Sequence, residues 1–316
     1  MMGSEQPGFS IGRLGHLVLG TRDLDAMLEH YCGRLGLALT ERSADTVYLT
    51  AGPEHHCLTI EKGAAGHLRT GFQVNGSLAE AERALRAQGI TADRRSDPEP
   101  GIADALMLTS PDSSILALYE RQTPSGVVPV HELRPRKLGH VARFADDLTE
   151  IRRFYLDGLG LRFGDSVAVD GREFFLFMRV GPDHHTVNFM ENPQESGLHH
   201  FAFEARDIDH VKNLLDSLAR EKVTLEWGVG RHGPGHNIFS YHRDPDGNLV
   251  EIFTDLDVMY DEELGYYEPR PWHEEYPQRP KAWERLRTPG NAWGPGPIDP
   301  ELLKPPAWVK EAMAAA

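Results

Sequence analysis

The chain repeats itself, and the repeat limits its fold more than any other feature. The segment "LGHLVLGTRDLDAMLEHYCGRLGLALTERS" at 14–43 matches "LGHVARFADDLTEIRRFYLDGLGLRFGDS" at 138–166. The match resumes where "GPEHHCLTI" answers "GPDHHTVNF" further along the chain. Self-similarity of this length predicts two homologous lobes. We expect an N-terminal lobe, a Pro-rich polar linker, a C-terminal lobe and a tail rich in Pro, Trp and Tyr, with these bounds: 1–125, 126–137, 138–260 and 261–316.

Each lobe reads as two copies of one supersecondary unit. A strand that starts near His140 leads through an Asp-Leu pair into an amphipathic helix over 147–158, which ends at Gly-Leu-Gly. Alternating apolar stretches such as "REFFLFMRV" predict the strands that follow, and the same order recurs from "HHFAFEA" onward. We therefore expect an α+β fold in which each lobe is a pair of βαβββ modules. Because such a pair must bury one sheet face, it should curve into a half-open barrel around a cavity.

Charge and composition exclude several classes of partner. A net charge of −15 leaves no basic surface for phosphates, so we expect no nucleic-acid partner. The sequence has no run of about 18 apolar residues and no apolar signal core at its start, so we expect no membrane span. Two cysteines, Cys32 and Cys57, are too few for a disulfide framework and favour a reducing compartment. These features predict a cytoplasmic protein that binds small molecules.

Two histidines and one glutamate stand at equivalent points on predicted strands of the C-terminal lobe. His140 opens the first strand, His200 opens the strand of the next module, and Glu251 lies in "NLVEIF". Non-haem Fe(II) enzymes commonly hold their metal with two imidazoles and one carboxylate, which predicts a metal site here. Adjacent side chains on a strand point to opposite faces. We expect His200 to face the metal and His199 to pack elsewhere or meet solvent, with support of a ligand as its alternative role.

The N-terminal lobe provides an internal control. It keeps the first histidine as His16, but Gly71 and Ala117 stand where the second histidine and the glutamate would be. A purely structural set would serve both lobes equally, so this asymmetry favours a metal site in the C-terminal lobe and its loss from the N-terminal lobe. The alternative interpretation is that Leu-Gly-His is a packing feature kept in both halves.

Four motifs make the sequence similar to the two-domain type I extradiol ring-cleavage dioxygenases of the vicinal oxygen chelate superfamily, which includes glyoxalases and bleomycin resistance proteins. They are "LGHVARF", "HHTVNF", "LHHFAFE" and "GRHGPGHNIFSYHRDPDGNLVEIF". The resemblance implies an enzyme that cleaves the ring of a catechol with O2 at a mononuclear Fe(II) centre, with Mn(II) as the alternative metal. It also implies a homo-oligomer.

The same resemblance implies roles for further residues. His185 would be the acid/base histidine, and His184 is the competing choice for that role. His232 and Tyr241 would donate hydrogen bonds to the substrate oxygens. An imidazole suits the acid/base role because its ordinary pKa lies near neutrality. The N-terminal lobe also keeps a His-His pair, so one histidine of such a pair can be structural.

Two features bear on the substrate. Relatives that act on acidic arylacetates carry an Arg a few residues before the distal histidine, whereas this chain has Trp227 there, which favours an uncharged or bulkier catechol. Arg231 or a tail residue remains an alternative anchor, and His236 is a candidate for the pocket lining. The tail is too rich in Pro for a long helix, so it is either a lid that brings aromatic rings to the substrate or an arm packed on a surface.

Two other functions share this scaffold. Glyoxalase-type isomerases and epimerases bind Zn or Ni and typically use a fourth protein ligand, which no matching strand position supplies here. Drug-sequestering members bind their ligand without any metal, and they would have no use for the two histidines and the glutamate together. The hydroxyphenylpyruvate dioxygenases use the same ligand types, but their C-terminal Gly/Phe-rich motif is absent from the sequence.

Overall fold

A computed structural model describes residues 9–267, 278–284, 290–294 and 296–314. The chain forms two compact units. The first unit comprises Met1–Leu138 and Thr149–Arg162, and the second comprises Gly139–Leu148 and Phe163–Ala316. Thr149–Arg162, which follows the first strand of the second repeat, therefore belongs to the first unit by its contacts.

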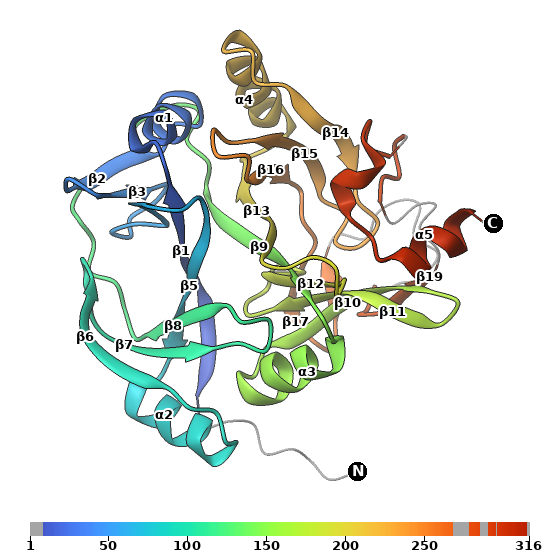
Figure 1. Cartoon of the computed structure of the whole chain (residues 1–316), viewed down its shortest axis with the longest axis horizontal. Coiled ribbons are helices and arrows are strands. Elements are labelled where there is room, and N and C mark those ends of the chain that lie inside the picture. The colour runs from blue at the N-terminus through green and yellow to red at the C-terminus, as the bar shows by residue number, and fades with distance from the viewer. Residues whose placement is uncertain (1–8, 268–277, 285–289, 295, 315–316) are drawn as a thin grey trace. The chain divides into compact units, whose positions relative to one another are not determined.

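The first unit is built on an eight-stranded sheet in the order β2-β3-β4-β1-β5-β8-β7-β6 (Figure 1). Two helical segments, α1 (Leu24–Leu28) continued by η1 (Glu29–Arg34) and α2 (Leu78–Ala87), lie on the outer side of this curled sheet (Figure 1). The strands are β1 (Ser10–Thr21), β2 (Ala38–Arg42), β3 (Thr46–Thr50), β4 (Leu58–Lys62), β5 (Gly66–Asn75), β6 (Asp93–Glu99), β7 (Ile102–Thr109) and β8 (Ile115–Tyr119).

The second unit is built on a nine-stranded sheet in the order β14-β15-β16-β13-β9-β12-β11-β10-β19. Its strands are β9 (Lys137–Ala145), β10 (Arg162–Val169), β11 (Arg172–Arg179), β12 (Val187–Glu191), β13 (Leu198–Glu204), β14 (Leu225–Arg231), β15 (Ile238–Arg243), β16 (Leu249–Thr254) and β19 (Ala282–Glu284). Its other elements are α4 (Ile208–Arg220), the hairpin β17 (Val258–Asp261) and β18 (Gly265–Tyr267), η3 (Pro300–Leu303) and α5 (Ala307–Ala314). The helical segments α3 (Leu148–Arg152) and η2 (Arg153–Gly158) fall almost entirely in the part of the chain grouped with the first unit.

The two sheets have the same topology. Leaving out β19, each strand of the second sheet occupies the place of the strand eight positions earlier in the first. In both units the first strand of a module pairs in parallel with its last strand, as β1 does with β4, β5 with β8, β9 with β12 and β13 with β16. The predicted α+β fold of four βαβββ modules in curled sheets is therefore confirmed.

The Leu-Gly-His motif has a packing role in each unit. A Cβ atom on Gly15 would lie 1.6 Å from the Tyr119 hydroxyl, and one on Gly139 would lie 2.4 Å from the Phe253 ring. Only glycine allows the aromatic side chain of β8 or β16 to cross this strand so closely. The glycine is thus explained by packing, whereas the histidine that follows it needs a separate explanation.

Helix ends and faces follow from local sequence. The Asp23 carboxylate accepts hydrogen bonds from the backbone N–H groups of Asp25 and Ala26 and so caps α1, as the Asp-Leu signal predicts. Ser77 and Glu80 form a capping box at the start of α2. Among the described residues, no helix is both long enough and apolar enough to cross a membrane.

Candidate metal centre and active-site cavity

The three predicted ligands lie on three neighbouring strands of the second sheet. His140 is on β9, His200 on β13 and Glu251 on β16, and β13 lies between the other two strands. All three side chains are buried, with His140 and Glu251 each 1% exposed. The curled sheet therefore brings together residues that are far apart in the sequence.

The donor atoms of these residues converge on one point. His140 Nε2 lies 3.0 Å from Glu251 Oε2, His200 Nε2 lies 3.3 Å from the same oxygen, and the two Nε2 atoms are 3.3 Å apart. Three donors on one face of an octahedron, each about 2.1 Å from a metal, lie about 3.0 Å from one another. The separations and the donor types therefore fit one divalent metal ion held on one face.

The electrostatics of this cluster favour the metal-binding forms of Glu251 and His200. Burial opposes ionisation of Glu251, but charge interactions and hydrogen bonds with His140 and His200 outweigh it and hold the pKa of the carboxyl well below its usual range. Burial lowers the pKa of His200, although Glu251 opposes that shift. A carboxylate beside a neutral imidazole is what a divalent cation requires.

His232 and Tyr241 lie beside this cluster. Tyr241, on β15, is the register partner of Glu251 and donates a 2.9 Å hydrogen bond to Glu251 Oε2. His232 Nδ1 lies 2.7 Å from the carbonyl oxygen of Gly290, which can only accept, so Nδ1 carries the proton and Nε2 is an acceptor, 3.1 Å from the Tyr241 hydroxyl. Burial lowers the pKa of His232 to about 4, against the opposing charge of Glu251, so the ring is neutral at neutral pH.

The two adjacent histidines before β12 occupy different surroundings. The ring of His185 lies 4.5 Å from that of His140, centroid to centroid, and lines a cavity beside the predicted ligands. His184 Nδ1 lies 2.9 Å from His185 Nδ1, and its Nε2 lies 2.9 Å from Asp165 Oδ2 on β10. Burial, with the nearby His140, holds the pKa of His185 well below its usual range. Asp165, His184 and His185 thus form a chain of contacts that ends at the cavity.

His199 differs from its expected position. It is buried rather than exposed to solvent, it lines the same cavity as His200, and its Nδ1 lies 2.6 Å from His200 Nδ1. A histidine that binds metal through Nε2 carries its proton on Nδ1, so His199 can accept that proton's hydrogen bond. The contact agrees with the alternative role of supporting a ligand.

The cavity has a volume of about 570 Å³ and is lined mainly by apolar side chains. Polar groups are concentrated at the predicted ligands and at His185, His232 and Tyr241. The apolar part of the lining includes Val167, Phe174, Phe175, Phe177, Met190 and Trp227. A small, largely apolar molecule with one polar edge would match this distribution.

The described part of the tail forms one wall of the cavity. Among its lining residues are Gly290, Asn291, Gly294, Pro297, Glu301 and Lys310. The tail is held at several places: β19 pairs with β10, the Ala292 N–H donates to the Arg231 carbonyl, and Val309 of α5 packs into the cluster around Phe174. The aromatic rings of the lining come from strands, however, and none of the described tail aromatics lines the cavity. Part of the segment "YYEPRPWHEEYPQRPKAWERL" lies outside the described residues.

Neither Arg231, the alternative anchor, nor His236, the candidate for the pocket lining, lines the cavity. The Arg231 guanidinium donates hydrogen bonds to the His236 carbonyl and to Asp255. His236 Nδ1 lies 2.5 Å from Asp257 Oδ2. Both side chains therefore have partners elsewhere in the unit, and neither is among the lining residues.

Asn237 is a functional residue that the sequence did not reveal. Its amide donates a 2.8 Å hydrogen bond to Glu251 Oε1, the oxygen that does not face the two histidines. Asn237 is the residue before β15, and no spacing rule distinguishes it from a loop asparagine. Its contact fixes the orientation of the carboxylate.

Comparison with known proteins agrees with this fold. The family model "Glyoxalase/Bleomycin resistance protein/Dioxygenase superfamily" matches residues 13–112 and 137–252. Manganese-dependent 2,3-dihydroxybiphenyl 1,2-dioxygenase of Geobacillus genomosp. 3 is 26% identical over 298 residues, which cover 86% of this chain and 93% of the relative. Metapyrocatechase of Geobacillus stearothermophilus is 25% identical over 329 residues, which cover 95% and 98%.

A solved structure shows the same fold. The anaerobic substrate complex of homoprotocatechuate 2,3-dioxygenase from Brevibacterium fuscum superposes with a TM-score of 0.80 at 24% identity, covering 96% of this chain and 93% of that one. The family model matches each of the two repeats separately. The chain therefore belongs to the glyoxalase/bleomycin resistance protein/dioxygenase superfamily.

Proposed function

We propose that the protein is an extradiol dioxygenase that cleaves the aromatic ring of a catechol-type substrate with O2 at a mononuclear Fe(II) centre. The convergence of His140 Nε2, His200 Nε2 and Glu251 Oε2 beside an apolar cavity carries this proposal. The relatives named 2,3-dihydroxybiphenyl 1,2-dioxygenase and metapyrocatechase, which align with most of the chain, support it.

His140, His200 and Glu251 would hold the metal. When bound, the metal would act as a Lewis acid for the diol and transfer electrons between substrate and O2, because three protein ligands leave positions open for both. We propose Fe(II), and a relative named iron-dependent extradiol dioxygenase, from Rhodococcus jostii, supports this choice. Mn(II) is the competing metal, since another relative is named manganese-dependent.

His185 would serve as the acid/base group. Its lowered pKa keeps the imidazole neutral, so a ring nitrogen is available to accept a proton from a catechol hydroxyl. The contact with His184 Nδ1, and the contact of His184 with Asp165, would orient the ring and stabilise it when it carries the proton. His185 then returns that proton as a general acid later in the reaction.

His232 and Tyr241 would position the substrate. Tyr241 presents a hydroxyl next to Glu251, and burial together with Glu251 raises the pKa of this hydroxyl well above its usual range, so it stays protonated as a donor. His232 Nε2 faces the same region as an acceptor for a substrate hydroxyl, and not as the donor that the resemblance implied, because its proton is on Nδ1. Together the two side chains would orient the polar edge of the ring toward the ligand cluster.

The cavity favours a substrate with an uncharged apolar substituent. The Lys310 ammonium lies 2.9 Å and 2.6 Å from the two Glu301 oxygens, so the one cation among the lining residues is neutralised. Trp227 adds an aromatic surface where an Arg anchor would be expected for an acidic substrate.

We further propose that the enzyme works as a cytoplasmic homo-oligomer, and size-exclusion chromatography with light scattering would test its oligomeric state.

The decisive test loads the purified protein anaerobically with Fe(II) and exposes it to a panel of catechols under air. We expect a yellow ring-fission product, dependence on Fe(II), and loss of both bound iron and activity in His200→Ala. The Arg206→Ala variant, altered a few residues away on the same segment, is the control and should keep both. Full iron content and full activity in His200→Ala would contradict the proposal.

A further inference from the structure

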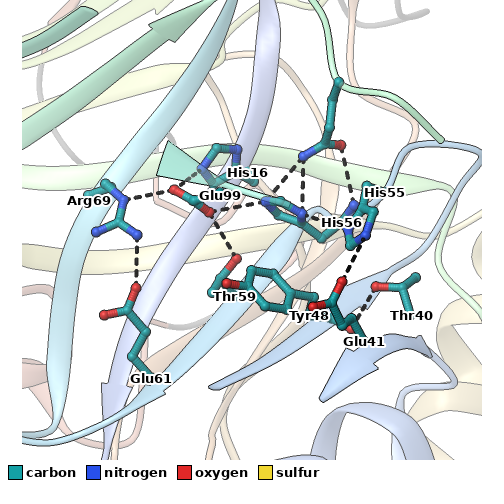
Figure 2. Close-up of polar contacts among 11 residues, drawn as sticks. His16, Thr40, Glu41, Tyr48, His55, His56, Thr59, Glu61, Arg69 and Glu99 are labelled. Carbon is teal, nitrogen blue, oxygen red and sulfur yellow. Dashed lines mark hydrogen bonds and ion pairs between the residues drawn. The ribbon is translucent and has the colours of Figure 1, made fainter. Parts of the chain in front are cut away.

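A second group of two histidines and one carboxylate is buried in the first unit. His16 lies on β1, His56 precedes β4, and Glu99 is the last residue of β6. His16 and His56 are fully buried and Glu99 is 6% exposed. We propose that His16, His56 and Glu99 form a second, structural site for a divalent cation of the Zn²⁺ class (Figure 2).

This group is not a remnant of the ligand set in the second unit. Gly71 and Ala117, which replace the second histidine and the glutamate, pair with each other across β5 and β8. A Cβ atom on residue 71 would lie 2.1 Å from His16 Cε1, so the imidazole occupies the space that a side chain there would need. Our inference departs from the prediction that the N-terminal lobe has lost its metal site, because that prediction considered only counterparts of the second-unit ligands.

Glu99 reaches the histidines because of a local irregularity in β6. The pairing of β6 with β7 shifts register between Ser96 and Glu99, and Asp97 adopts a φ of 47°. A bulge of this kind changes the direction of the side chains that follow it. The carboxylate therefore comes from the strand that corresponds to β14, and not from the counterpart of β16.

The donor atoms fit a small divalent cation. His16 Nε2 lies 3.1 Å from Glu99 Oε1, and His56 Nε2 lies 3.2 Å from Glu99 Oε2. One donor atom from each of the three residues can be chosen so that all lie within 4.8 Å of one another. Donors about 2.0–2.2 Å from a tetrahedral Zn²⁺ lie about 3.3 Å apart, which both His–Glu99 separations match, with each histidine facing a different oxygen of the carboxylate. The Thr59 hydroxyl, 3.3 Å from Glu99 Oε2, or a water molecule would take the fourth position.

The histidine pair beside this group repeats an arrangement found at the proposed iron centre. His55 Nδ1 lies 3.1 Å from His56 Nδ1, as His199 Nδ1 lies close to His200 Nδ1. Such a contact holds the proton of the inner histidine on Nδ1. The Gln122 amide nitrogen lies 3.1 Å from His56 Nε2, so binding of a metal there would require this amide to turn away. The same local device therefore serves both groups.

The charges around the group also favour a cation. Arg69 donates 2.8 Å hydrogen bonds to Glu99 Oε1 and to Glu61, so its single positive charge is shared between two carboxylates (Figure 2). Glu41 adds a third carboxylate, 3.6 Å from His55 Nε2. Three carboxylates and one guanidinium therefore surround this group, an excess of negative charge that a divalent cation would reduce. Arg69 would then orient the ligand carboxylate from its other side.

The test uses a His140→Ala/His200→Ala variant, in which the proposed iron centre is disabled, and measures Zn²⁺ by calorimetry and by metal analysis after dialysis. We expect one Zn²⁺ per chain in this variant and a rise in melting temperature on binding. Adding His56→Asn or Glu99→Gln should weaken Zn²⁺ binding by at least about 100-fold. Replacing a residue that only hydrogen-bonds a metal ligand already lowers metal affinity by about 10–100-fold, and loss of a ligand itself should cost more. Adding His67→Gln, which removes a histidine of β5 outside the group, should leave binding unchanged.

A metal-free ion-pair network would give a different result. No stoichiometric Zn²⁺ in the His140→Ala/His200→Ala variant, or full binding retained with Glu99→Gln, would overturn the proposal. If Glu99→Gln does not fold, Co²⁺ is added to the His140→Ala/His200→Ala variant and its d–d absorption spectrum is measured. We expect the bands of a low-symmetry site with nitrogen and oxygen ligands. The spectrum of free Co²⁺ would contradict the proposal. The ring-cleavage activity of the His56→Asn variant distinguishes failure of this proposal from failure of the proposed function. We expect this variant to keep the ring-cleavage activity of the wild type.

Discussion

The Tyr241 hydroxyl donates a 2.9 Å hydrogen bond to Glu251 Oε2, the same oxygen that faces His140 and His200. This oxygen is therefore shared between the predicted metal ligands and the residue proposed to position the substrate. A change at Tyr241 should affect turnover more than metal retention, because Asn237 still holds the other carboxylate oxygen.

We expect Tyr241→Phe to lower kcat by about 10²-fold while the iron content stays near that of the wild type, as loss of one well-placed donor does in other enzymes. Steady-state kinetics with metal analysis of the same samples would measure both. Unchanged kcat with an intact metal site would rule out the positioning role.

The two histidines before β12 should differ in their effect. Only His185 lines the cavity, so His185→Gln should lower kcat by about 10²–10⁴-fold without loss of iron. His184→Gln, which alters only the contact behind that ring, should cost less and should change the pH profile of kcat. The reverse order of effects would assign the acid/base role to His184.

Neutralising Glu301 should change substrate preference. Glu301→Gln leaves the Lys310 ammonium without its carboxylate partner at the cavity wall, so a catechol with a carboxylate substituent should gain about tenfold in kcat/KM relative to an uncharged one. The Glu301→Gln/Lys310→Met variant is the control, and the gain should disappear in it. An equal gain in both variants would mean that Lys310 does not contact the substituent.

Buried histidines should make the metal-free protein less stable in mild acid. Burial, with a smaller contribution from Arg34, lowers the pKa of His30 to about 3. Between about pH 6.5 and 3 the unfolded chain binds a proton at this residue that the folded chain does not, so the free energy of unfolding falls as the pH falls, by up to about 1.4 kcal/mol per pH unit. Urea unfolding at pH 7, 6 and 5 should show a shallower decline for His30→Gln than for the wild type.

Removal of the metal should lower stability as well as activity. His140, His200 and Glu251 connect three strands, and a ligand present at 100 times its Kd stabilises a folded chain by about 2.7 kcal/mol. Chelation should therefore lower the melting temperature of the wild type, measured calorimetrically, and Fe(II) should restore it. A chain with His56→Asn and a disabled iron centre should show no change on chelation.

Much of the fold was predictable because the repeat and the alternation of apolar residues are local signals. Comparison of the two lobes identified His140, His200 and Glu251, which the structure brings together as a group that could hold a metal ion in the second unit. The helix at α4 and the strands around it follow the same periodic signals.

Other features depended on three-dimensional details that periodicity does not carry. Alternation predicted that His199 would face away from the cavity, but the edge of its ring still reaches His200. Glu99 approaches His16 only because the pairing of β6 with β7 is irregular. The sequence "SDPE" at 96–99 does not predict the direction in which the Glu99 side chain points after this irregularity. Asn237 and the tail wall depend on register and on long-range packing.

The tail wall has no regular secondary structure along 290–294, but it is bound directly to β14, where the Ala292 N–H donates to the Arg231 carbonyl, and it is also anchored beyond its ends at β19 and at α5. The position of this cavity wall therefore depends both on β14 and on packing contacts made farther along the tail. Replacing the fully buried Val309 by Ala should loosen the packing of α5 and so weaken substrate affinity. Val309 packs in the cluster around Phe174, which contains none of the proposed metal ligands and not the proposed acid/base histidine. Selection for new substrates can therefore act on the end of the chain while the chemistry remains untouched.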